Sequence, residues 1–447
     1  MFYKIVAVKS LFIGIFGLGS VLFSNAQSTT YDLKSCLDYG LANHPGIKAA
    51  GHDIGFARAR ANEGISQYLP QINASGGLDY NIKLQTTVLP GGIFGPDPTE
   101  VRFGTKWIAN AAIQLDQKIF DLTYIMGYTA NKPSVDLNRK IQEKVREDVA
   151  FDIASNYQKV LIAKEQIKLL NISEANLKKI LDVSELQLNK GILRQTDYDR
   201  IKVQYNNVKS QVFIAESGLD LATNALKMSM GMPASENISI QDSVRFDSNS
   251  TAPVSDDFVL DKRLDYNIIN QSIWLQNVQL KMTKAAYSPS ISAYARYGGL
   301  GQRDDFNEIW KNFTDFSSIG LRLHIPIFDG LYRNAKVKQQ KYSLMKEKEN
   351  LELYKLQFEM QFKNARFQLE RSKTSLLNDL ENLELAQSMY EQTALQYEKG
   401  VATLSDLLNA EMSFNQARNN YITSVSNVKL AELEYEKAKG TLMTYLN

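Results

Sequence analysis

Three histidines and one cysteine are the side chains of this 447-residue sequence that are best suited to metal binding or nucleophilic chemistry. His44 and His52 lie eight residues apart, with no Glu or Cys at the spacing of a metal site. His324 is isolated from both, and Cys36 has no second cysteine for an internal disulfide. No phosphate-binding loop, nucleophile elbow or dinucleotide fingerprint follows residue 26. These patterns predict no enzyme activity, no cofactor and no metal.

The charge balance and the N-terminal residues limit the remaining classes of function. The chain has 51 basic and 49 acidic residues, for a net charge of +2, so we expect no nucleic-acid partner. Residues 1–26 contain two lysines, an apolar run and a final Ser-Asn-Ala, which is typical of a signal peptide. No later run of 18 apolar residues could form a membrane-spanning helix. If the mature chain enters a membrane, it does so as strands.

A strand with two different faces is predicted where the sequence reads YLPQINASGGLDYNIKL, residues 68–84. Ile72, Leu78 and Ile82 fall on one parity of the alternation. Asn73, Asp79 and Lys83 fall on the other parity. Because successive side chains of a strand point to opposite faces, this segment has one apolar face and one polar face.

The chain is duplicated. YLPQINA at 68–74 returns as YSPSISA at 287–293, and LDQKIFDL at 115–122 returns as LHIPIFDG at 323–330. Each half therefore contains two alternating runs, which we interpret as a β-hairpin, and the polar parity of the second hairpin includes Arg296 and Arg322. The Gly- and Pro-rich segment 86–104 between the first two runs is expected to be an irregular loop.

Long helices account for most of the rest. Apolar residues at steps of three and four form heptad seams after Gly191 and after Gly400, and Pro-free stretches at 134–189 and 331–398 precede them. Shorter helices are expected at 33–67 and 258–286. The predicted organisation is a first repeat at 27–230, a connector at 231–257 with one short strand at 238–240, and a second repeat at 258–447.

Four strands per chain cannot close a barrel, and an open sheet edge in lipid leaves backbone groups unpaired at several kcal/mol each. The chain must therefore oligomerise if it enters a membrane. Two copies would give a barrel filled by side chains, whereas three would give 12 strands and begin to leave a lumen. The polar parity of the strands favours three copies.

These features together resemble the TolC family of outer membrane efflux proteins. The resemblance covers the mature chain and includes the signal peptide, the duplicated helix and hairpin plan, the YxP strand starts, the IFD elements and the segment YEKGVATLSDLLNAE. It implies a mainly α fold with a membrane β-barrel, namely a homotrimer with a 12-stranded outer membrane barrel and a coiled-coil helical tunnel through the periplasm. It also implies the function of a passive exit duct in a tripartite efflux or type I secretion system of a Gram-negative bacterium. The implied partners are a periplasmic adaptor, an inner-membrane pump of RND, ABC or MFS type, and outer membrane lipid.

The resemblance places a periplasmic gate at the helical turns around Gly191 and Gly400. This chain keeps the family's Tyr397 and Asp406, whereas Ala402 and Asn409 replace two charged residues, and Asp197 takes the matching acidic position in the first turn. Asp197 and Asp406 could form carboxylate rings in a trimer. Alternatively, they could simply favour helix starts capped by Thr196 or Ser405.

Lys190 and Lys399 beside the tip glycines could contact the adaptor, or could be solvated charges near a helix end. A rival function from another class is a secreted periplasmic coiled-coil tether. It would explain the heptads but not the alternating strands.

Overall fold

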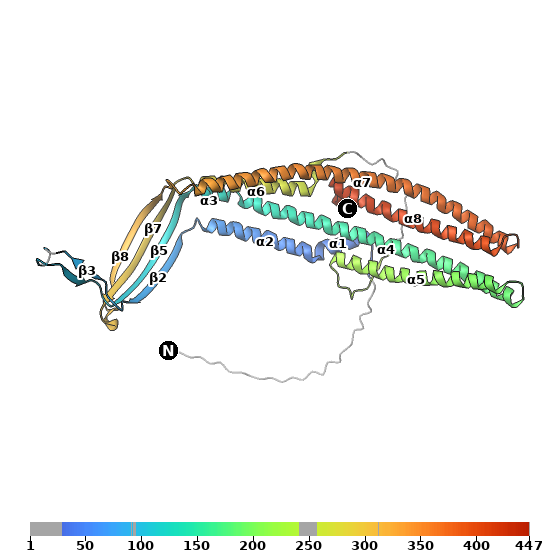
Figure 1. Ribbon diagram of the computed structural model, residues 1–447, viewed down its shortest axis with the longest axis horizontal. Helices are drawn as coiled ribbons and strands as arrows, with labels where there is room; N and C mark the ends of the chain where they lie inside the picture. Colours follow the sequence, from blue (N-terminus) through green and yellow to red (C-terminus); the bar gives the residue numbers. More distant parts are fainter. Residues whose placement is uncertain (1–28, 91, 93–94, 241–256, 312, 447) are drawn as a thin grey trace, which may run out of the picture.

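The computed structural model describes residues 29–446 apart from 91, 93–94, 241–256 and 312. The predicted signal peptide at 1–26 and most of the connector at 231–257 lie outside the described residues. The molecule is elongated, with a β-sheet at one end and long helices running away from it (Figure 1). In chain order the elements are β1 (Thr29–Tyr31), α1 (Leu33–Asn43), α2 (Pro45–Ser66), β2 (Gln71–Tyr80), β3 (Thr86–Leu89), β4 (Thr99–Arg102), β5 (Trp107–Asp121), α3 (Leu122–Tyr128), α4 (Asn131–Asn189), α5 (Gln195–Met230), β6 (Ile238–Ile240), α6 (Leu264–Ala285), β7 (Ser290–Arg303), β8 (Thr314–His324), α7 (Tyr332–Glu398), α8 (Leu404–Lys439) and α9 (Leu442–Leu446), with 3-10 turns at Leu260–Lys262 and Phe306–Glu308.

The two longest helices set the length of the molecule. α4 has 59 residues and α7 has 67, which at about 1.5 Å per residue correspond to roughly 90 and 100 Å. Each folds back into a partner, α5 or α8, through a tight turn at the end farthest from the sheet (Figure 1). Both turns contain a glycine with left-handed φ, 72° at Gly191 and 73° at Gly400, which costs a Gly little. Within the described residues, none of the helices combines the length and the apolar character needed to cross a membrane.

The predicted heptad seams are the packed faces of these helix pairs. On α5, Ile201 and Leu226 are fully buried, and on α8, Val428 and Ala431 are buried. A further cluster of buried side chains lies where α1, α4 and α5 meet, and it includes Ile153 from α4. The seams were readable from the sequence because burying an apolar stripe is the main source of stability for a long helix.

Two short strands join the ends of the first half. β1 pairs in parallel with β6, so that Thr29 lies opposite Ile238 and Tyr31 lies opposite Ile240. The predicted strand at 238–240 is therefore confirmed. Its partner, β1, was not expected from the sequence, because three residues are too few to show an alternation.

The four longer strands form one antiparallel sheet with the order β2-β5-β7-β8. β2 pairs with β5 and β7 pairs with β8, as expected for one hairpin in each half, and the β5–β7 ladder joins the two halves. A register shift between Lys118 and Phe120 interrupts that central ladder near the helical end. Among the described strands, none pairs with the outer edges of β2 and β8.

Two sequence expectations about the first hairpin are wrong. The first strand ends at Tyr80 rather than continuing to residue 84, so Lys83 lies beyond the strand. The side-chain amide of Asn81 donates to the backbone oxygen of Thr105 at 2.8 Å, and the chain bends after it. The segment 86–104 is not an irregular loop but contains the hairpin β3–β4. Its three prolines, Pro90, Pro96 and Pro98, lie between the two strands, whereas its β-branched Thr and Val residues favour strands.

The helix expected at 33–67 is interrupted at His44 and Pro45, where α1 ends and α2 begins. Pro45 has no backbone N–H to donate, so it fits the first position of a helix but not its interior. The backbone N–H of Gly46 donates to His44 Nδ1 at 3.1 Å, which makes His44 the cap of α2. The break explains the role of one of the three histidines.

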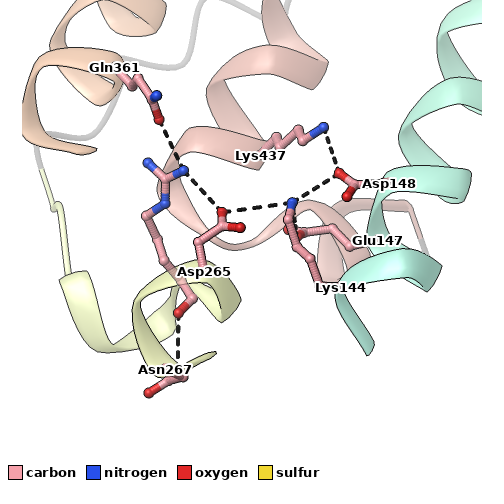
Figure 2. A network of polar contacts seen from close by, with 8 residues as sticks. Lys144, Glu147, Asp148, Asp265, Asn267, Gln361 and Lys437 are labelled. Atoms are coloured by element: carbon pink, nitrogen blue, oxygen red, sulfur yellow. Dashed lines mark hydrogen bonds and ion pairs between the residues drawn. The ribbon is translucent and has the colours of Figure 1, made fainter. Parts of the chain in front are cut away.

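A polar network ties the two halves together in the middle of the helical region (Figure 2). Lys144 of α4 donates to Asp148 at 2.9 Å and lies 3.7 Å from Asp265 of α6. Lys437 of α8 lies 2.9 Å from Asp148. Burial alone would raise the pKa of Asp148, but the hydrogen bonds from Lys437 and Lys144 outweigh it and lower the pKa. These charges therefore stabilise one arrangement of α4, α6 and α8.

Candidate functional site

The register of the sheet places the predicted polar residues on one face. Asn73 lies opposite Gln114, Gln114 opposite Arg296, and Arg296 opposite Ser318, so one polar row crosses all four strands. Directly opposed residues in a sheet share a face. Arg322, Asp79 and Lys118 lie at even-numbered steps from members of this row and belong to the same face. Lys83, although predicted to share this face, follows the end of β2 and has no place in the row.

The opposite face of the sheet is apolar and open. It carries Ile72, Leu78, Ile113, Ile319 and Leu321, whose exposed fractions are 67%, 46%, 55%, 87% and 72%. A contiguous apolar surface of this kind is unusual on a soluble monomer and marks contact with another protein or with a membrane. The sheet thus separates two environments, one wet and one apolar.

The helical tips form the opposite end of the molecule. Lys190 and Gly191 lie in the turn between α4 and α5, and Lys399 and Gly400 lie in the turn between α7 and α8. All four residues are exposed. Neither lysine forms an ion pair within the part of the chain that the structure describes, and both side chains are exposed to solvent in the single chain.

Asp406 forms part of the capping box at the start of α8. Its backbone N–H donates to Thr403 Oγ1 at 3.2 Å, and its carboxylate accepts from the Thr403 backbone N–H at 3.0 Å and from the Thr403 hydroxyl at 2.6 Å. This reciprocal capping box lowers the pKa of Asp406, chiefly through the hydroxyl hydrogen bond. The expectation that Ser405 caps this helix is wrong, since Thr403 does so.

Asp197 has no such role. It lies in the first turn of α5, where Arg194 is the cap residue and forms no side-chain capping bond, so Thr196 is not the cap either. Asp197 is half-buried. The two acidic residues that the sequence paired are therefore not equivalent. The carboxylate of Asp406 is held by hydrogen bonds at the start of α8, whereas the carboxylate of Asp197 is available for other contacts.

The two tips pack against each other through side chains. A buried cluster joins Leu181 and Ile201 of the first helix pair to Leu404 and Leu408 of the second, and Tyr397 packs against it. Burial raises the pKa of Tyr397, and the nearby Asp197 carboxylate raises it further. Tyr397 and Asp197 are both half-buried, whereas Asp406 is exposed.

Sequence analysis missed a buried polar site above the tips. Arg418 of α8 donates to the Leu169 backbone oxygen of α4 at 2.9 Å and to Ser173 Oγ at 3.0 Å. Glu411, two helical turns earlier, is only 2% exposed, and its Oε2 has no hydrogen-bond partner among the described residues. Burial raises the pKa of Glu411 to about 7, although Arg418 opposes the shift. Charged residues on a heptad helix are normally solvated, so the sequence pattern gave no sign that these two are buried.

Among the described residues, no three His, Cys, Asp or Glu side chains lie close enough together to hold a metal ion. The polar face and the tips can instead line a passage for water and ions, because they carry exposed charged side chains and lie at the two ends of one elongated chain.

The sequence and the fold of the chain are similar to those of known outer membrane proteins. Residues 37–232 and 272–441 match the family model described as outer membrane efflux protein. The chain is 21% identical over 452 residues to outer membrane protein TolC of Escherichia coli, covering 97% of this chain and 87% of the relative. It shares its fold with the CmeC outer membrane channel of Campylobacter jejuni, with a TM-score of 0.74, 16% identity and coverage of 98% and 94%. The outer membrane protein VceC of Vibrio cholerae gives a TM-score of 0.73, 13% identity and coverage of 91% and 96%.

The buried carboxyl of Glu411 predicts a pH-dependent stability. Its pKa is about 7 in the folded chain against an ordinary value of 4.5, so the folded state holds the proton more tightly. The resulting stabilisation is complete below pH 4.5 and is lost as the pH rises through 7. At pH 8, Glu411→Gln should therefore have a free energy of unfolding that is larger than that of the parent protein by on the order of 3 kcal/mol, and it should unfold at a higher temperature. Near pH 4.5 the two proteins should differ little in stability.

Thermal unfolding in detergent, followed by circular dichroism from pH 4.5 to 8, measures this difference. Glu384→Gln is the matched control, because Glu384 is exposed on α7. Parallel stability curves for Glu411→Gln and the parent protein would contradict a buried protonated carboxyl.

Proposed function

Because the chain belongs to the outer membrane efflux protein family, we propose that three copies form a passive exit duct from the periplasm to the cell exterior. The protein lies in the outer membrane of a Gram-negative cell and extends into the periplasm. The observation that carries the proposal is the register of the sheet, which separates a polar face from an exposed apolar face. In the duct the apolar face meets lipid, and the polar face lines a water-filled lumen.

The open edges of the sheet support the number of copies. β2 and β8 each have one side without a partner among the described strands. Pairing β8 of one copy with β2 of the next removes every edge when the ring closes. Three copies supply 12 strands, enough to leave a lumen, whereas the 8 strands of two copies would be filled by side chains.

The organisation of the chain fits this assembly. We divide it into a first repeat at 27–230, a connector at 231–257 and a second repeat at 258–447, each repeat supplying two strands and one long helix pair. The six helix pairs of a trimer form the wall of a coiled-coil tunnel. A duct of this kind performs no chemistry.

The periplasmic gate of the duct lies at the helical tips. Closure rests on the packing of Leu404, Leu408 and Tyr397 with Leu181 and Ile201. Asp197 and Asp406 face permeating ions as carboxylate rings, even though Asp406 also belongs to the capping box of its own helix. Ala402 and Asn409 supply no charge for an ion-pair latch.

Export requires further components. The sequence has no nucleotide-binding loop, so energy comes from an inner-membrane pump of RND, ABC or MFS type. A periplasmic adaptor joins that pump to the duct, and Lys190, Gly191, Lys399 and Gly400 are the exposed tip residues that contact it.

The first prediction from the proposed function concerns closure of the barrel. Native mass spectrometry of the detergent-purified protein should give three chains, because a single four-stranded sheet leaves two unpaired edges. The same preparation should conduct ions in a planar lipid bilayer. A folded monomer that stays inserted in lipid would refute the closure argument.

The second prediction concerns the two faces of the sheet. Leu78→Arg should hinder insertion into lipid by about 2 to 4 kcal/mol if the side chain lies near the membrane midplane, because it puts a charge on the apolar face. Asn73→Arg, on the same strand but the polar face, is the matched control and should insert normally. Folding into lipid vesicles at graded urea concentrations measures both variants, and equal effects would show that the faces are misassigned.

The third prediction concerns the gate. The double variant Asp197→Asn and Asp406→Asn should lower the cation preference of single-channel currents, because carboxylate rings attract permeating cations. Closed-state leakage should depend only weakly on salt concentration, since apolar packing is not screened. Asp199→Asn is the control, because Asp199 is an exposed carboxylate on the same helix as Asp197. Unchanged selectivity in the double variant would show that the two aspartates are helix-start residues only.

A further inference from the structure

A repeating arrangement of rings and guanidinium groups lies on the polar face of the sheet, on β7 and β8. Along this face β7 presents Ser292, Tyr294, Arg296 and Gly298, and β8 presents the directly opposed Arg322, Gly320, Ser318 and Phe316. The Arg322 guanidinium carbon lies 5.3 Å from the centre of the Tyr294 ring. The Arg296 guanidinium carbon lies 5.0 Å from the centre of the Phe316 ring. We call Arg322, Tyr294, Arg296 and Phe316 the cationic ladder.

Two glycines fix the rings of the cationic ladder. A Cβ on Gly320 would lie 2.8 Å from Tyr294 Oη, and a Cβ on Gly298 would lie 2.8 Å from Phe316 Cζ. Each ring therefore lies across the backbone of the opposite glycine, where any other residue would displace it. Because each ring is held in place, it gives its arginine a fixed apolar support rather than a freely rotating neighbour.

The two guanidinium groups remain available. Arg296 and Arg322 are both exposed, and neither forms an ion pair with another side chain in the described part of the chain. The nearest carboxylate on this face by register is Asp116, opposite Tyr294, and it accepts hydrogen bonds from the Gln114 side chain at 2.9 and 3.1 Å. Two other acidic residues belong to this face by register. Asp79 lies toward the far end of β2, and Asp121, opposite Ser290, accepts from the backbone N–H of Thr123 at 3.0 Å. Each guanidinium thus has one side against a ring and its remaining donors open to solvent.

We propose that the cationic ladder binds anionic aromatic solutes as they pass through the lumen. A planar anion can stack on a guanidinium and pair with its charge at the same time, whereas a small anion can only pair with the charge. The ladder thereby favours one chemical class of cargo over cations and over non-aromatic anions. This inference rests on the proposed function, because it requires the polar face to line the duct.

The experiment measures block of the open channel by a defined probe. Single-channel currents of the purified trimer are recorded with naphthalene-1-sulfonate added to the compartment that faces the β-sheet end of the molecule. The recording is then repeated with methanesulfonate. Naphthalene-1-sulfonate should block the parent protein at a lower concentration than methanesulfonate. In the double variant Arg296→Gln and Arg322→Gln, half-block should need about tenfold more naphthalene-1-sulfonate.

Three further variants separate charge from stacking. Arg296→Lys with Arg322→Lys keeps the charge but loses the planar group, so the preference for the aromatic anion should shrink. Tyr294→Leu with Phe316→Leu keeps both arginines and should weaken block because the guanidinium groups lose their support. Arg102→Gln removes one positive charge from β4, outside the four-stranded sheet, and should leave block unchanged.

Two results would overturn the inference in different ways. Equal block of the parent channel by the two sulfonates would refute the cationic ladder as a binding site but would not contradict the proposed duct. This test uses the parent protein alone, so its result does not depend on the folding of any variant. Absence of any conductance from a folded trimer in lipid would refute the proposed function, and the inference with it.

Discussion

The open edges of the four-stranded sheet are the constraint on which the rest of the molecule depends. β2 and β8 each expose a row of backbone N–H and C=O groups on their outer sides within the described residues. In water such edges favour pairing with other chains, and in lipid they are too costly to remain open. The exposed apolar face of the same sheet also favours contact with lipid or with another protein over contact with water. A coiled-coil tether would need neither feature, so the sheet is what separates the duct from that alternative.

Much of the fold could be predicted because it depends on periodic patterns. The seams of α5 and α8 and the two parities of β2 repeat along the sequence, and each repeat reports directly which side chains are buried or opposed. The expected helices at 134–189 and 331–398 agree with α4 and α7 to within a few residues. The sequence could also place glycines at both tips, since a tight return between two helices favours a residue that accepts positive φ.

The features that could not be predicted depend on contacts between distant residues. Glu411 and Arg418 look like ordinary solvated heptad residues, and only the approach of α4 to α8 buries them. The pairing of Phe316 with Gly298 likewise depends on the register between two strands, which neither strand specifies alone. Asp406 shows the converse case. The sequence places an acidic residue in the first turn of this helix, but Thr403, three residues earlier, determines how its carboxylate is held. Which of its roles dominates in a trimer stays a prediction.

The parallel pair β1–β6 has a consequence for how the chain is made. β1 begins at Thr29, at the start of the first repeat, and β6 ends at Ile240, in the connector that follows that repeat. During synthesis and export, β1 emerges first and has no partner until the whole α4–α5 hairpin has followed and folded back on itself. Its backbone groups stay unpaired through that interval, and the ladder closes only after a long-range contact has formed. A folding helper that shields extended segments would therefore act most usefully on the newly exported N-terminus, before the first repeat is complete.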